Sequence, residues 1–157
     1  HQDAIMRTDS VVSTIQTEGI ILEKLSYQFA NWNRGQAENK MTQLINRYGT
    51  DIELVISNND EMALGAAAAY DALGYPQESR PVILGIDGLD SALEAVKKGY
   101  IQGTVYNDKE GQASRISGLA LDLFRGKILP NSDFENGRYI FLPYHKVTAD
   151  NVDEFLK

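Results

Sequence analysis

Residues 51–108 contain the alternation that decides the fold: DIELVISNNDEMALGAAAAYDALGYPQESRPVILGIDGLDSALEAVKKGYIQGTVYND. Apolar periodicity and helix-ending glycines predict five successive elements: strand 52–56, helix 60–73, strand 82–86, helix 90–98 and strand 101–106. Strands that alternate with helices of this length favour a parallel sheet with helices on both faces. The sequence therefore predicts the α/β class.

The flanking sequence continues the alternation in both directions. Five further elements and a short closing helix near Val152 are expected: helices 4–18, 35–48 and 110–125, and strands 20–27 and 139–142. On the helix over 110–125, the apolar positions expected to face inward are Ala113, Ile116, Ala120 and Leu123. The polar segment 126–137 is expected to be a linker or lobe boundary.

Composition excludes several classes of function. The 157 residues are 43% hydrophobic and 24% charged, which fits one globular domain. Fifteen Lys and Arg against 22 Asp and Glu give a net charge of −7, which disfavours nucleic acid as a partner. The absence of cysteine excludes disulfides and thiolate chemistry, and no apolar run approaches the roughly 20 residues that span a bilayer, so no membrane insertion is expected.

Polar side chains follow the predicted strands at the edge where ligands bind to open parallel sheets. The helix over 4–18 brings its first residues to the same edge if a strand precedes it. The candidate residues at this edge are His1, Asp3, Arg7, Trp32, Asn58, Asn59, Asp60, Asp87, Asn107 and Asp108. Carboxylates, amides and a guanidinium hydrogen-bond hydroxyl groups, and an indole face covers C–H surface, so the set suits an uncharged polyol such as a pyranose.

Each candidate also has a structural interpretation. Asn and Asp after a strand are often N-caps of the next helix, and Asp60 and Asp90 are expected to be caps. A single tryptophan is more often a core residue than a ligand platform. The sequence contains no phosphate-binding glycine loop, nucleophile elbow or His-Glu-x-x-His motif, so it gives no support for an enzyme.

Five segments resemble a known family in order and spacing. They are HQDAIMR at 1–7, Trp32, SNNDEMA at 57–63, GIDGL at 85–89 and GTVYND at 103–108. Together they resemble the C-terminal part of the bacterial galactose/glucose-binding proteins, which are type I periplasmic sugar-binding proteins of ABC import and chemotaxis. The resemblance extends over essentially the whole chain and ends with FLPY at 141–144.

The resemblance implies roles for the candidate residues. It implies that Trp32 stacks on one face of the sugar ring, and that the ligand, D-galactose or D-glucose, is held by lobe closure. The polar side chains that it implies hydrogen-bond the sugar hydroxyls are His1, Asp3, Arg7, Asn59, Asp87 and Asn107. It also implies that Glu53 is one ligand of a structural calcium ion whose binding loop is not in this chain. No other cofactor is expected, and no catalytic residue.

The resemblance further implies an incomplete lobe. Family members have a first lobe and the opening strands of the second ahead of the position of His1, so the chain is expected to be truncated. Residues 1–107 are expected to form part of the C-terminal lobe, 108–142 to cross to the absent N-terminal lobe, and 143–157 to return. Such a chain is expected to be destabilised, to dimerise through the apolar stripe of helix 110–125, or to be accompanied by the missing residues.

The resemblance implies that the protein is located in the periplasm or, as a lipoprotein, at the cell surface. It implies a hexose, an ABC permease and a chemoreceptor as partners. Two other functions stay open on sequence. The effector-sensing domain of a LacI-type repressor has the same lobe architecture, and an upstream basic headpiece would favour it. The other is a sugar-processing enzyme, which would form a product when it is incubated with hexoses.

Overall fold

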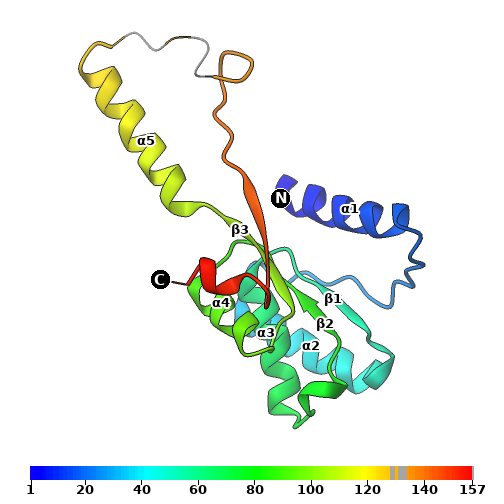
Figure 1. The fold of residues 1–157 in the computed structure, drawn as a ribbon. Helices are drawn as coiled ribbons and strands as arrows, with labels where there is room; N and C mark the ends of the chain where they lie inside the picture. Colours follow the sequence, from blue (N-terminus) through cyan, green and yellow to red (C-terminus); the bar gives the residue numbers. More distant parts are fainter. Residues whose placement is uncertain (128–129, 131–133, 157) are drawn as a thin grey trace.

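The fold is built on a four-stranded mixed sheet in a computed structural model that describes residues 1–127, 130 and 134–156 (Figure 1). The strands, in sheet order, are β1 (Leu54–Ile56), β2 (Val82–Leu84), β3 (Gly103–Asn107) and β4 (Tyr144–Thr148). The first three are parallel, and β4 is antiparallel to β3. The α/β class is confirmed, and the sheet is mixed rather than wholly parallel because β4 returns alongside β3 from the far end.

Helices alternate with these strands as predicted. The α-helices are α1 (Gln2–Thr17), α2 (Arg34–Tyr48), α3 (Asp60–Ala72), α4 (Asp90–Lys97) and α5 (Lys109–Phe124), and the 3-10 turns are η1 (Gly49–Asp51), η2 (Gln77–Ser79) and η4 (Val152–Glu154). Polar N-caps start three of the helices: Asn33 accepts from Gln36 N–H at 2.9 Å, and Asn59 and Asp108 cap α3 and α5 in the same way.

The core lies between the sheet and the helices α2, α3 and α4. Tyr70 of α3, Ile83 of β2 and Leu93 of α4 are at most 1% exposed. Burial of a side chain of this size contributes about 1.5–3 kcal/mol. Gly65 lets α2 and α3 approach closely, because a Cβ there would overlap the backbone carbonyl of Arg34. This core fixes the strand ends on which the candidate site depends.

Two predicted strands are wrong. Residues 20–27 pair with no strand among the described residues, although Tyr48 Oη donates a hydrogen bond to Leu25 O at 3.0 Å. Residues 139–142 form only an isolated bridge between Glu135 and Tyr139. In both segments the residue types favour a strand, but a ladder also requires a neighbouring strand. Pairing of β4 with β3 starts only at Tyr144, opposite Asn107, the last residue of β3, so residues 139–142 lie beyond the end of β3.

Helix α5 extends away from the sheet, and the chain returns from it to β4 (Figure 1). The residues expected to face inward are exposed: Ala113, Ile116, Ala120 and Leu123. Within the described part of the chain, no sheet covers this helix, and none of its residues is buried. The division into 1–107, 108–142 and 143–157 stays a prediction, and residues 128–129 and 131–133 of the expected linker 126–137 lie outside the described residues.

No helix in the described ranges combines the length and the apolar character needed to cross a membrane.

Candidate functional site

The centre of the candidate site is an ion pair between Arg7 of α1 and Asp87, which follows β2. Arg7 Nη1 lies 3.4 Å from Asp87 Oδ1, and the two side chains are 23% and 30% exposed. The same nitrogen donates a hydrogen bond of 2.7 Å to the backbone carbonyl of Asn58, which follows β1. One guanidinium thus connects the first helix to the ends of two strands.

Trp32 lies beside this ion pair, two residues before the start of α2. Arg7 Cζ is 5.9 Å from the centroid of the indole, and the His1 ring meets the indole edge-on with centroids 5.6 Å apart. Trp32 is 37% exposed, so part of the indole is open to a ligand. Its φ of +61° and that of Asn31, +50°, lie in the left-handed region. Such backbone costs about 1–3 kcal/mol per residue and concentrates at functional sites.

The other predicted residues lie next to this group. They differ in which of their polar atoms already have a partner within the chain. Asp3 lies 3.6 Å from the His1 ring nitrogen and is exposed. Asn59 Nδ2 lies 3.5 Å from the Trp32 carbonyl, while its Oδ1 caps α3. Asn107 donates its backbone N–H to Asp87 O at 3.0 Å, but its side-chain oxygen accepts from Gln112. We call the seven residues together the polar rim.

The electrostatics of the polar rim favour hydroxyl recognition. Burial raises the pKa of Asp87, the Arg7 guanidinium opposes this rise, and the negative charge of Asp60 adds to it. An ion pair with its two side chains partly open can both donate to and accept from hydroxyl groups. The partly exposed indole of Trp32 alongside offers apolar surface to a sugar ring.

Two neighbours have roles that the sequence reasoning missed. Asn58 binds α1: its Nδ2 lies 2.9 Å from Thr8 Oγ1 and 3.3 Å from Ala4 O. Asp60 is fully buried rather than a cap, because the cap of α3 is Asn59, and the residue at the N-cap position of α4 is Leu89 rather than Asp90. The run SNND at 57–60 predicts polar groups at this edge of the sheet, but it does not indicate which side chain points to the rim, which to α1 and which to the core.

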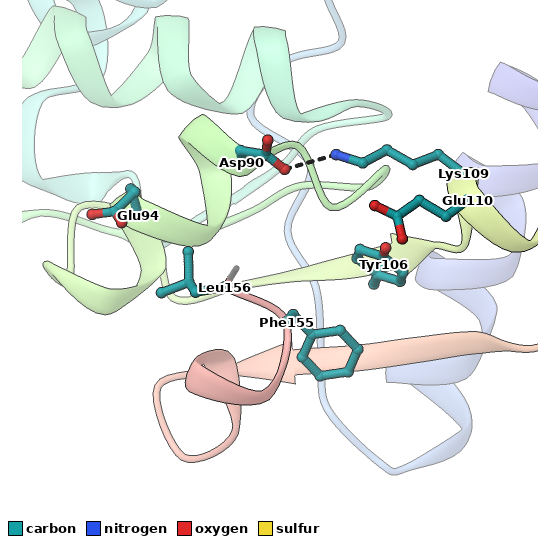
Figure 2. A pocket seen from close by; sticks show the side chains of 7 residues that line it. All are labelled: Asp90, Glu94, Tyr106, Lys109, Glu110, Phe155 and Leu156. Carbon is teal, nitrogen blue, oxygen red and sulfur yellow. Dashed lines mark hydrogen bonds and ion pairs between the residues drawn. The ribbon is translucent and has the colours of Figure 1, made fainter.

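A separate hollow of about 170 Å3 lies where α4, β3, α5 and the C-terminal residues meet (Figure 2). It is lined by Asp90, Glu94, Tyr106, Lys109, Glu110, Phe155 and Leu156. Lys109 Nζ is 2.7 Å from Asp90 Oδ1, and the rings of Tyr106 and Phe155 pack on each other with centroids 5.1 Å apart. No residue of the polar rim lines this hollow, so the two are different surfaces.

The calcium prediction at Glu53 stays a prediction. Calcium takes six to eight oxygen ligands. In the ranges that the structure describes, no three His, Asp or Glu side chains gather closely enough to hold a metal ion. Glu53 is exposed just before β1, and one carboxylate alone does not fit a calcium site.

The fold and the polar rim define the class of protein as a lobe of the type I periplasmic binding proteins. Residues 1–128 match the model of the periplasmic binding protein domain, and the chain belongs to that family.

Similar proteins are binding proteins for small solutes. The chain is 36% identical over its whole length to the D-galactose/methyl-galactoside binding periplasmic protein MglB of Haemophilus influenzae, covering 47% of that protein. It is 38% identical over 99% of its length to a putative rhizopine-binding protein of Rhizobium meliloti, covering 48%. A Bacillus halodurans ABC transporter solute-binding protein, solved with bound myo-inositol, aligns with TM-score 0.81 and 34% identity, over 96% of this chain and 48% of that one. The chain thus spans about half the length of the relatives it matches, which are named as binding proteins and not as enzymes.

Proposed function

We propose that this chain is the sugar-binding lobe of a substrate-binding protein that serves an ABC importer in the periplasm or, as a lipoprotein, at the cell surface. The main support is the polar rim, in which a partly exposed indole adjoins the Arg7–Asp87 ion pair. The similar proteins add support, since one is named for galactose and another was solved with myo-inositol. Both ligands are uncharged and rich in hydroxyl groups.

The proposed ligand is D-galactose or D-glucose, the pair that the sequence motifs imply. Trp32 stacks on the C–H face of the ring, and Arg7 with Asp87 binds adjacent hydroxyl groups. His1, Asp3, Asn59 and Asn107 complete the hydrogen bonds. Closure of a second lobe over the ligand adds contacts that only the closed form makes, and a permease or a chemoreceptor recognises that form.

We expect the chain alone to bind sugar weakly. A micromolar complex corresponds to about −8 kcal/mol, and a rim that makes half of the contacts retains about −4 kcal/mol, which is near millimolar. Micromolar affinity of the chain alone would contradict the two-lobe mechanism and leave the ligand class intact.

The direct test uses Trp32, the one tryptophan of the sequence. Its fluorescence is titrated with D-galactose, D-glucose and myo-inositol, and with succinate as an anionic control. The proposal predicts a saturable change of emission with a hexose and none with succinate. A chain that is folded by circular dichroism but gives no saturable response to any of the sugars would refute it.

A further inference from the structure

Asp60 is a buried carboxylate beneath the polar rim to which the proposed binding chemistry assigns no contact with sugar. It is the first residue of α3 and is 0% exposed. Thr104 of β3, itself 3% exposed, donates its hydroxyl to Asp60 Oδ1 at 2.6 Å. The backbone N–H of Leu89 donates to Asp60 Oδ2 at 2.8 Å. Both carboxylate oxygens thus have partners, one on β3 and one in the turn that precedes α4.

Asp60 forms hydrogen bonds to the chain on both sides of Asp87 in the sequence. The backbone N–H of Asp60 donates to Ile86 O at 2.8 Å, one residue before Asp87, and the side chain accepts from Leu89, two residues after it. Asp87 itself has a φ of +127°, a value that non-glycine residues rarely adopt. Backbone of this kind persists only where its surroundings enforce it.

Close packing leaves the turn little room to relax around Asp60. A Cβ at Gly85 would overlap Asp60 Oδ1, and a Cβ at Gly88 would overlap the ring of Tyr106. The backbone of Asp87 is also bonded to β3, through Val105 O at 2.9 Å. The sheet therefore anchors Asp87 from one side, while Asp60 alone supplies the acceptor for Leu89 on the other.

We propose that Asp60 is a positioning residue, whose carboxylate holds the turn over 86–89 so that Asp87 keeps its left-handed backbone and directs its side chain to Arg7. The part of this inference that concerns sugar affinity rests on the proposed function. The part that concerns the backbone conformation of Asp87 does not. Asp60 contacts no ligand in this arrangement. It acts on binding only through Asp87.

The test compares two substitutions of Asp60 with a packing control. Asp60→Ala removes both acceptors. Asp60→Asn retains an oxygen for Leu89 N–H and presents an amide N–H2 to the Thr104 hydroxyl, so it preserves both contacts. Val96→Ala in α4 is the control, because Val96 is a core residue, 1% exposed, that belongs neither to the turn over 86–89 nor to the polar rim, so that its truncation is expected to lower stability alone.

The first readout needs no ligand. The three-bond coupling between the amide and α protons of Asp87 is small at its φ of +127° and large for an extended backbone. We expect the small coupling in the unsubstituted chain, in Asp60→Asn and in Val96→Ala, and an increased coupling in Asp60→Ala. An unchanged coupling in a folded Asp60→Ala chain would overturn the inference.

The second readout is the dissociation constant for D-galactose from Trp32 fluorescence. We expect a loss of at least tenfold for Asp60→Ala, a loss within about threefold for Asp60→Asn, and none for Val96→Ala. If Asp60→Asn loses as much as Asp60→Ala, the two hydrogen bonds do not position Asp87 and the inference fails. If the unsubstituted chain binds no sugar, the proposed function fails, and the coupling still decides the role of Asp60.

Discussion

At the scale of single residues, Asp87 is the most sensitive point of the polar rim, because it combines a partly buried charge with a left-handed backbone. Hydrogen bonds to charged groups contribute about 1.5–3 kcal/mol, so Asp87→Ala is expected to weaken sugar binding by roughly 10- to 150-fold. Asn59→Ala is expected to cost only about 1 kcal/mol of affinity, with a similar loss of stability from the missing cap. Titrations and urea unfolding of both variants measure this, with the exposed Asp150→Ala as control. Equal losses of affinity would contradict the ranking.

The buried carboxylate predicts a pH dependence of stability. Burial raises the pKa of Asp60 above its ordinary value, while the bonds from Thr104 and Leu89 offset part of the rise. Ionising Asp60 therefore costs more in the folded chain than in the unfolded one, so its contribution to the free energy of unfolding is full below about pH 4 and is lost as the pH rises through the folded pKa.

Asp60→Asn removes this dependence. The difference in free energy of unfolding, variant minus unsubstituted chain, is expected to shift in favour of the variant between pH 4 and pH 7. Urea denaturation followed by circular dichroism at several pH values measures it. A difference that stays constant over this range would mean that the pKa of Asp60 is not raised.

The sequence predicted which residues meet at the rim better than it predicted what each one does. The rule that ligands bind at the carboxyl ends of parallel strands accounts for the positions of Asn59, Asp87 and Asn107, whereas Trp32 follows a segment that forms no strand. Hydrogen bonds, ion pairs and ring contacts link all seven residues of the polar rim. Their binding roles stay predictions. The roles of Asn58 and Asp60 were not predictable, because a run of adjacent polar residues does not reveal which side chain turns toward the helix and which toward the core.

At the scale of elements, α1 depends on polar contacts for its place on the lobe. No residue of α1 is buried in the structure as described, and Asn58 provides three atoms that bind it, including the carbonyl for Arg7. Asn58→Ala removes the side-chain contacts, each contributing about 0.5–1.5 kcal/mol.

We expect amide exchange in α1 to accelerate about tenfold in this variant while exchange in α3 is unchanged, as measured by hydrogen–deuterium exchange. Thr42→Ala, which removes a hydrogen bond of 2.9 Å within α2, is the matched control. Uniform acceleration across both helices would indicate global destabilisation and contradict the local role of Asn58.

The helices and the three parallel strands were predictable from local signals, whereas the strands expected over 20–27 and 139–142 do not form. All five α-helices begin and end within two residues of their predicted bounds, because caps and glycines act locally. The segment over 20–27 has strand-forming residues but no ladder partner in the described chain, and Tyr139 lies beyond the end of β3. Pairing depends on residues distant in the sequence, which residue types do not reveal.

At the scale of the whole molecule, the apolar surface of α5 decides the behaviour in solution. Ile116, Leu121, Leu123 and Phe124 are 52–89% exposed. Apolar patches of this kind promote association. We expect the chain to self-associate at high concentration in sedimentation experiments and to bind a hydrophobic dye, and Leu123→Glu combined with Phe124→Glu to reduce both.

Ile21→Glu is the control for this prediction, because Ile21 is 96% exposed but distant in sequence from α5. It is expected to leave self-association unchanged. A chain that stays monomeric and binds no dye would show that the exposed apolar surface of α5 does not drive self-association.

The central claim is that the polar rim, and not the neighbouring hollow, binds an uncharged sugar. It is tested most directly by intermolecular nuclear Overhauser effects at saturating D-galactose. We predict effects between the ring protons of Trp32 and the C–H protons of the sugar. Effects to Tyr106 and Phe155, which line the hollow, without any to Trp32 would contradict the claim.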